Sequence, residues 1–406
     1  MKYVIIGAGA AGITASKTIR ALEGDSEIVV ISTDGAVHSR CMLGDYISGE
    51  RDDKGLSFIP DGFFESTGIR WLSGVTVTDV DTENKRVKFF GDTEQYDRLL
   101  IATGSNNVIP PVGGLREARN VFGLRHLSGA KAIRKHAMTS ENIVVIGAGL
   151  VGLNAANALA AMGKKPVVVE ALASIMAQNL DKRAAEVYQK RFEQAGCVFR
   201  LGCKVAGTVL DGAGIVTAIT LDSGESIPCD IAIVATGTRP AISFLASTGI
   251  ECDGGITVDE YLSTNIEGVY AAGDATGLSG IWPNAMKQGE VAAKNMCGIP
   301  TVYDDAFALK NAVNFFGLQS VSIGILEPAE GDCVEIWEDR NNYRKVILRG
   351  GVVVGIITQG NISNSGIWQH LVKNKIDISR VKKPVRKLSF ADFYDIEPSG
   401  EYKWAT

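Results

Sequence analysis

Two glycine-rich segments offer the clearest chemistry in this chain. Gly7–Gly12 and Gly147–Gly152 both read GxGxxG, and each directly follows a short apolar run, Tyr3–Ile6 and residues 143–146. Such glycines turn the chain, let the backbone approach a pyrophosphate and let the next helix pack against the strand. Because the N-terminus of that helix directs free N–H groups at the phosphates, we expect two dinucleotide sites. The predicted contacts are Gly7, Gly9, Ala10, Ala11 and Gly12, and Gly147, Gly149, Leu150, Val151 and Gly152.

A carboxylate after the second strand of each unit would bind an adenosine ribose. In the first unit the strand over 28–31 ends at Ser32, and Asp34 follows slightly later than is usual. We predict that Asp34 binds the ribose; the alternative is an exposed turn residue. In the second unit the strand Val167–Glu170 ends in a carboxylate, and residues 171–180 contain no arginine for a 2′-phosphate. Glu170 therefore favours NAD over NADP.

The cysteines and histidines show no metal-ligand pattern. The 7 cysteines lack CxxC spacing, and the 4 histidines lack HExxH spacing. An iron–sulfur cluster, a zinc site or a disulfide framework is therefore not expected. We predict that the chain binds no metal.

The elements that must position these turns have the order of an α/β protein. Each turn lies between a buried strand and a helix rich in apolar or small residues, as in a parallel sheet. Residues 99–101 form a further buried run. The last hundred residues do not show this α/β order. Their pattern predicts an antiparallel meander and then a helix near 363–373. The three strands of that meander are Val334–Trp337, Tyr343–Leu348 and Val352–Thr358.

Composition excludes several classes of protein. Hydrophobic residues make up 46% of the 406 positions and charged residues 21%, as in ordinary globular proteins. The net charge of -5 argues against binding to bulk nucleic acid or an anionic membrane. No apolar stretch reaches the roughly 18 residues of a membrane span. Because the chain starts directly on a strand, we expect no signal peptide and a cytoplasmic protein.

Five motifs in a fixed order resemble the pyridine nucleotide–disulfide oxidoreductase superfamily of FAD-dependent NAD(P)H reductases. They are Gly7–Gly12, Ala102–Gly104, Gly147–Gly152, Ala235–Gly237 and Ala272–Asp274. The resemblance implies an α/β fold with two Rossmann-like dinucleotide-binding domains, the second inserted in the first, plus a small α+β C-terminal domain. It implies FAD binding by 1–110 and 235–305, NAD(H) binding by 111–234, and an interface or capping domain at 306–406.

The resemblance also assigns roles to single residues. Asp274 would bind the ribityl chain of FAD, and a helix beginning near Pro283 would direct its N-terminus at the flavin pyrimidine. Hydride would pass from nicotinamide to flavin, and electrons would then leave for a second acceptor. The remaining cofactor contacts expected are Ser32, Arg40, Cys41, Val77, Ala102, Thr103, Gly104, Gly237, Gly273 and Trp282.

The segment 38–50 resembles two branches of the superfamily. Cys41, Leu43 and Tyr46 match the single-cysteine branch of coenzyme A disulfide reductases and NADH oxidases, in which one cysteine faces the flavin. His38-Ser-Arg40 and the segment 280–289 match the rubredoxin, ferredoxin and nitrite reductase-like flavoproteins. Cys41 is thus either a redox-active catalytic thiol or a small apolar residue beside the flavin.

At two places the chain departs from the sequence patterns of other superfamily members, and these departures bear on its activity. Glutathione and lipoamide reductases need a second cysteine five positions after the first, where this chain has Tyr46, and a C-terminal His-Pro motif, which 306–406 lack. Many superfamily members have Glu after the second glycine motif, where this chain has Asn154. Asn154 can bond a carboxamide but supplies no charge.

The end of the chain is charged and aromatic. Its basic residues are Lys373, Lys375, Arg380, Lys382, Lys383, Arg386 and Lys387, and an acidic tail with an exposed Trp404 follows. A charge run is usually a solvated face, but this one would also suit an acidic iron–sulfur electron carrier or partner subunit.

We therefore expect an NADH-linked FAD oxidoreductase that exchanges electrons with rubredoxin, ferredoxin or iron–sulfur subunits of a larger dehydrogenase. One alternative is a Cys41-dependent NADH oxidase or coenzyme A disulfide/persulfide reductase. Another is an NADH-sensing flavoprotein with a signalling or scaffold role.

Overall fold

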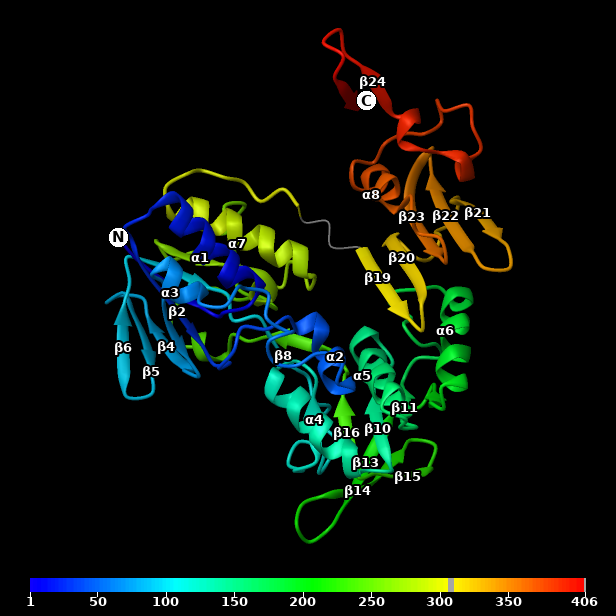
Figure 1. Ribbon diagram of the computed structural model, residues 1–406, viewed down its shortest axis with the longest axis horizontal. Helices are drawn as coiled ribbons and strands as arrows, with labels where there is room; N and C mark the ends of the chain where they lie inside the picture. The colour runs from blue at the N-terminus through cyan, green and yellow to red at the C-terminus, as the bar shows by residue number, and fades with distance from the viewer. Residues whose placement is uncertain (306–309, 405–406) are drawn as a thin grey trace.

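The computed structural model describes residues 1–305 and 310–404. Two α/β domains lie side by side, and a C-terminal domain stands on the second of them (Figure 1). This arrangement confirms the predicted fold class: two parallel sheets of the Rossmann kind and a separate antiparallel sheet. No helix in the described residues is long and apolar enough to cross a bilayer.

The first domain is built on a parallel sheet whose strand order is β18-β7-β1-β2-β3. Side chains of its central strand alternate between two apolar layers, Tyr3 and Ile5 on one face and Val4 and Ile6 on the other. Helices α1 and α7 cover the first face, and a β4–β5–β6 meander covers the second (Figure 1). These elements are β1 (Lys2–Ile6), α1 (Ala10–Leu22), β2 (Glu27–Ser32), β3 (Arg70–Ser73), β4 (Val77–Asp81), β5 (Arg86–Phe89), β6 (Asp92–Gln95), β7 (Arg98–Ile101), β18 (Val269–Ala271) and α7 (Trp282–Met296).

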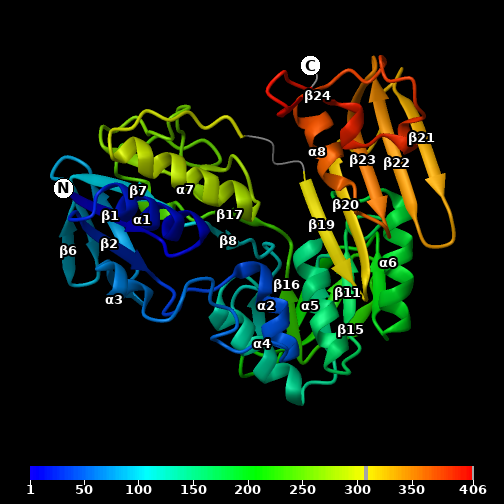
Figure 2. The ribbon, with the colours of Figure 1, turned by 45° about the horizontal axis from the view of Figure 1, so that its top comes forward.

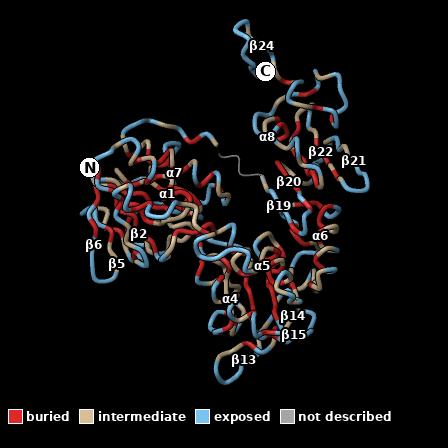
Figure 3. The backbone as a smooth tube through the Cα atoms, in the orientation of Figure 1, coloured by how far each residue is buried: buried red, intermediate tan, exposed pale blue. Residues whose placement is uncertain are grey.

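The second domain repeats this plan with the strand order β12-β11-β10-β16-β9. Ile143 and Val145 pack toward the helices, whereas Val144 and Ile146 pack toward a β13–β14–β15 meander. Figure 3 shows both parallel sheets as buried segments. The elements are β9 (Val121–Gly123), α4 (Leu127–Thr139), β10 (Ile143–Ile146), α5 (Leu150–Ala161), β11 (Val167–Glu170), α6 (Lys182–Gln194), β12 (Val198–Leu201), β13 (Val205–Leu210), β14 (Val216–Leu221), β15 (Ser226–Pro228) and β16 (Ile231–Val234).

Two short strands join the α/β domains. β8 (Ser105–Asn107) leaves the first domain, β17 (Thr238–Pro240) returns to it, and the two pair antiparallel. The chain then adds β18 beside β7. The segment 38–50 contains a 3-10 turn, η1 (Arg40–Met42), and helix α2 (Leu43–Ser48), which packs in the core of the second domain. The expected domain boundaries stay a prediction.

The C-terminal domain is a five-stranded antiparallel sheet with one helix. The three predicted strands appear as β21 (Cys333–Glu338), β22 (Tyr343–Arg349) and β23 (Val352–Gln359), and the predicted helix as α8 (Ser365–Lys373). Strands β19 (Lys310–Phe315) and β20 (Leu318–Gly324), which the sequence analysis missed, complete the sheet. A hairpin of β24 (Tyr394–Ile396) and β25 (Tyr402–Trp404) follows. Trp404, expected to be exposed, is half-buried, and its ring stacks on His370 with centroids 3.4 Å apart.

One face of this sheet is fixed to the second domain. The Tyr343 hydroxyl donates to Asp181, the N-cap of α6, at 2.6 Å, and both side chains are buried. The hydroxyl of Tyr188 on α6 donates to the Leu318 carbonyl at 2.8 Å. Phe315 and Ile357 belong to the same apolar core as α6. The C-terminal sheet and the second domain therefore share a core.

Candidate functional site

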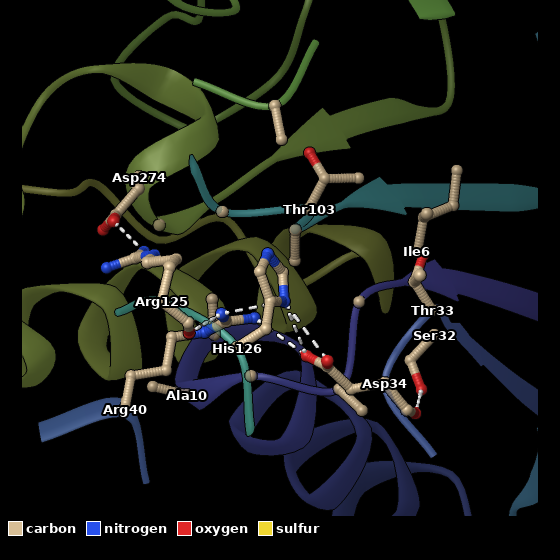
Figure 4. A pocket seen from close by; sticks show the side chains of 18 of the residues that line it. Ile6, Ala10, Ser32, Thr33, Asp34, Arg40, Thr103, Arg125, His126 and Asp274 are labelled. Atoms are coloured by element: carbon tan, nitrogen blue, oxygen red, sulfur yellow. Dashed lines mark hydrogen bonds and ion pairs between the residues drawn. The ribbon is translucent and has the colours of Figure 1, made fainter. Parts of the chain in front are cut away.

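A cavity of about 400 Å³ lies at the carboxyl ends of β1, β2 and β7. This edge of a parallel sheet is where doubly wound folds bind ligands. The cavity extends from Thr76 and Asp34 past the first glycine turn to Cys41 and Trp282. Figure 4 shows its charged side chains from three segments converging on one space.

The first glycine turn has the geometry that a pyrophosphate needs. Gly7 adopts a φ of 113°, which favours glycine, and its N–H donates to the Ile31 carbonyl at 2.7 Å. A Cβ at Gly9 would meet no atom within 4 Å, so this position borders open space in the cavity. A Cβ at Gly12 would instead collide with the Gly7 carbonyl. Gly9 thus leaves room for a ligand, and Gly12 permits the helix to pack.

Asp34 is held by Arg40 and His126 rather than lying in an exposed turn. Arg40 Nη2 donates to Asp34 Oδ2 at 3.2 Å, and His126 Nδ1 lies 3.2 Å from Oδ1 (Figure 4). Burial would raise the pKa of Asp34, but the His126 hydrogen bond and the Arg40 charge outweigh it and lower that pKa. Asp34 is therefore an ionised acceptor at the end of β2, where a ribose would bind.

Asp274 forms a second charged group at the other side of the cavity. It lies in the 3-10 turn η3 (Gly273–Thr276) and accepts hydrogen bonds from Arg125 Nη2 and from Ser105 Oγ, the latter at 2.9 Å. Arg125 Nε also donates to the Ser105 carbonyl at 3.2 Å. Asp274 is thus fixed at the wall of the first cavity, and its contact with the ribityl chain stays a prediction.

Cys41 is exposed at the mouth of the first cavity, within η1. The protein atoms around its sulfur desolvate it enough to raise its pKa, against the lowering effect of the Arg125 charge. Reactive thiols usually sit in surroundings that lower the pKa. The surroundings of Cys41 therefore favour a neutral thiol.

A second cavity of about 660 Å³ repeats this design at the carboxyl ends of β10, β11 and β16. Both carboxylate oxygens of Glu170 accept backbone hydrogen bonds, from Ala148 at 2.7 Å and from Leu172 at 2.9 Å. A Cβ at Gly149 would again meet no atom within 4 Å. The cavity thus combines an open glycine turn with a fixed carboxylate, as NAD binding requires.

The structure brings most of the predicted residues together. Those lining the first cavity are Gly7, Gly9, Ala10, Ala11, Ser32, Asp34, Arg40, Cys41, Val77, Ala102, Thr103, Gly104, Gly273, Asp274 and Trp282. Those lining the second are Gly147, Gly149, Leu150, Val151, Glu170 and Gly237. Gly12, Gly152 and Pro283 line neither; both glycines lie where a Cβ would strike backbone, and Pro283 belongs to the first turn of α7.

Arg125 and His126 are the main residues that the sequence analysis missed. Both follow β9 in the second domain, yet both line the first cavity, and Arg125 lines the second cavity as well. Asn154, named as a carboxamide partner, lies instead against Gly44 of α2 and lines neither cavity. No metal-binding group of three or more His, Cys, Asp or Glu occurs in the part of the chain that the structure describes.

Comparison with known families decides the class of this site. Residues 1–289 match the model of the pyridine nucleotide-disulphide oxidoreductases. The chain belongs to this family. Residues 310–376 match a second model, the C-terminal domain of rubredoxin NAD+ reductase. The protein is therefore an NADH-linked FAD oxidoreductase. We name its parts the FAD domain, the NAD domain and the C-terminal domain, after the cofactors that the sequence resemblance predicts for the first two.

Individual relatives support this placement. The chain is 29% identical to subunit epsilon of an NADH-dependent phenylglyoxylate dehydrogenase from Aromatoleum evansii, over 94% of this chain and 93% of that subunit. It is 29% identical to the Bacillus subtilis nitrite reductase [NAD(P)H], of which it spans 48%. Among solved structures, an NAD-dependent persulfide reductase from A. fulgidus has a TM-score of 0.83 and 26% identity, over 93% of this chain and 77% of that one.

The residues on both sites fit their cofactors. Gly9 and Gly149 leave the space that a pyrophosphate would fill, and α1 and α5 begin directly after them. Asp34 and Asp274 would accept from ribose and ribityl hydroxyls, and Arg40 and Arg125 would supply positive charge to an anionic cofactor in the first cavity. Arg125 borders both cavities, so the reacting ends of the two cofactors would meet in its neighbourhood.

Proposed function

We propose that this flavoprotein transfers electrons between NAD(H) and an iron–sulfur protein in the cytoplasm. The partner is a rubredoxin, a ferredoxin or the iron–sulfur subunits of a larger dehydrogenase. The carrying observation is the match of residues 310–376 to the C-terminal domain of rubredoxin NAD+ reductase, which supports a protein partner. The surroundings of Cys41 raise its pKa and so do not favour a thiol relay.

The chain's own residues prepare this transfer. Bound FAD would supply a two-electron acceptor for hydride and pass the electrons onward. Glu170 would orient NADH through its ribose, and Asp274 would orient the flavin through the ribityl chain. The N-terminus of α7, which begins at Trp282 in the first cavity, would stabilise negative charge on the reduced flavin.

Exposed basic residues on the C-terminal domain suit an acidic partner. Lys373 and Lys383 are paired with Asp305 and Asp392. Lys375, Arg380, Lys382 and Lys387 are exposed to solvent. Opposite charge on a carrier would raise the rate of encounter, and salt would lower that rate.

Two other functions compete with this proposal. The persulfide reductase likeness favours a Cys41-dependent reductase or NADH oxidase. A signalling flavoprotein is the second alternative, and it would keep a long-lived reduced complex with NAD and reduce every acceptor slowly.

An anaerobic NADH titration of the wild type and Cys41→Ser separates these functions. We expect both proteins to bleach with one equivalent and without a long-wavelength band. Two equivalents, with a thiolate–flavin band that Cys41→Ser lacks, would establish the thiol reductase instead. Reduced protein is then mixed with rubredoxin or ferredoxin at rising salt, and a rate that falls with salt supports the partner assignment. Failure to bleach at all would remove the NADH assignment.

A further inference from the structure

A third cavity, of about 580 Å³, lies in the C-terminal domain. It is lined by residues of β21, β22 and β23 and by Arg386 from the segment after α8. Figures 1 and 2 both show β21 and β22 at the side of this domain that faces away from α1 and α7. The cavity is therefore separate from both dinucleotide sites.

Three residues are paired with one another across the strands that line this cavity. Trp337 of β21 is directly opposite Arg344 of β22, which is directly opposite Thr358 of β23. Residues paired in this way project from the same face of a sheet. On that face the Arg344 guanidinium lies over the ring of Trp368 from α8, 5.7 Å from its centroid. The cation–π contact helps to hold the guanidinium in place.

Arg344 has no counterion in the described chain. Within residues 1–305 and 310–404, its guanidinium forms no hydrogen bond or ion pair and lies against the Trp368 ring. Arg344 is half-buried, and burial lowers its pKa with no opposing contribution from a carboxylate. A partly desolvated charge is costly unless a counterion satisfies it.

The acidic residues of the same cavity are already engaged. Glu338 is paired with Arg183 of the NAD domain. Asp339 accepts backbone hydrogen bonds from Asn341 at 2.8 Å and Asn342 at 3.0 Å. Arg386 adds a second, exposed guanidinium to the lining. The cavity thus offers two guanidinium groups without a carboxylate committed to either.

We propose that this cavity binds an aromatic phosphate monoester. Two guanidinium groups match a phosphate, which carries a charge near −2 and accepts paired hydrogen bonds. The half-exposed Trp337 indole beside them offers a surface on which a planar ring can stack. The site is independent of the electron partner proposed above.

Calorimetric titration of the FAD-loaded protein in saturating NAD+ tests this site. The probes are phenyl phosphate, inorganic phosphate and benzoate, and NAD+ keeps them out of the NAD cavity. We expect phenyl phosphate to bind at least about tenfold more tightly than either of the others. Arg344→Gln should weaken its binding about ten- to hundredfold, since a hydrogen bond to a charged group contributes roughly 1.5–3 kcal/mol.

Matched variants keep the result interpretable. Arg340→Gln removes an arginine from the neighbouring β21–β22 turn that does not line the cavity, and it should leave binding unchanged. Arg386→Gln and Trp337→Leu should each weaken binding, and they provide the test if Arg344→Gln does not fold. NADH oxidation should be unchanged in Arg344→Gln.

Three results would overturn the proposal. The first is that phenyl phosphate shows no binding below about 1 mM. The second is that benzoate binds more tightly than phenyl phosphate. The third is that none of the variants of lining residues changes the affinity for phenyl phosphate. Equal affinity for inorganic phosphate, together with no effect of Trp337→Leu, would reject the aromatic part of the assignment.

Discussion

The Arg125 guanidinium donates a hydrogen bond to the Asp274 carboxylate and thereby joins two domains at the border between the cofactor cavities. Arg125 follows β9 of the NAD domain, whereas Asp274 lies in η3 of the FAD domain. The FAD cavity is therefore completed by a segment that belongs to the neighbouring domain.

Replacing Arg125 should weaken FAD binding. Arg125→Met removes a cation that lines the FAD cavity and leaves Asp274 without its ion pair. We expect the FAD dissociation constant of the apoprotein to rise about tenfold or more, as for other hydrogen bonds to charged groups. Flavin fluorescence during reconstitution measures it. Arg116→Met is the control, because Arg116 donates to the Ile109 carbonyl outside the cavity; an equal effect there would contradict the assignment.

Asp34 should give the apoprotein a stability that acid removes. Its pKa is lowered in the folded state, so its contribution is fully present above the unfolded value near 4 and is lost as pH falls through the folded value. The facing groups are Arg40, His126 and His38. Asp34→Asn should therefore have a lower Tm than the wild type at pH 7, and the gap should close below about pH 4. A gap that stays constant with pH would refute this role.

Glu170 should set the choice between NADH and NADPH. Glu170→Ala removes the carboxylate that would bind the 2′-hydroxyl and repel a 2′-phosphate. We expect KM for NADH to rise about tenfold while the preference over NADPH shrinks. Steady-state kinetics with both nucleotides measure the ratio. Glu225→Ala, which breaks an exposed pair with Arg200, should change neither KM.

The effect of a Gly44→Ala substitution on stability should depend on Asn154. A Cβ at Gly44 would collide with the Asn154 carboxamide, although alanine is otherwise the better helix former. Gly44→Ala should destabilise the protein by about 1–3 kcal/mol in urea unfolding, as overpacking does. In the Asn154→Ala background the same change should cost much less. Equal costs in both backgrounds would show that the two residues do not interact.

Periodicity and glycine spacing were sufficient to predict the cofactor turns. Each turn is local, because a buried strand, three glycines and a helix follow one another along the chain. Asp34 and Glu170 were predictable for the same reason. Glu170 ends the strand that pairs with the strand before its turn, and Asp34 follows two residues after the corresponding strand of the first domain.

Arg125 and His126 could not be predicted in this way. Their place in the FAD cavity depends on how the β8–β17 connection orients one domain against the other, and no short-range pattern records that orientation. The local sequence shows no more than an arginine and a histidine between β9 and α4. The sequence predicted three strands of the C-terminal sheet. It did not predict β19 and β20, which precede those three along the chain.

The shared core of the C-terminal sheet and the NAD domain means that these two domains should move together as one body. The Tyr343–Asp181 and Tyr188–Leu318 bonds tie α6 to the C-terminal sheet. Rotation about the β8–β17 connection would therefore carry the nucleotide cavity and the basic surface together relative to FAD. A ligand that favours one angle between this body and the FAD domain would also bias where an electron partner can dock, and the partner would bias nucleotide affinity by the same free energy.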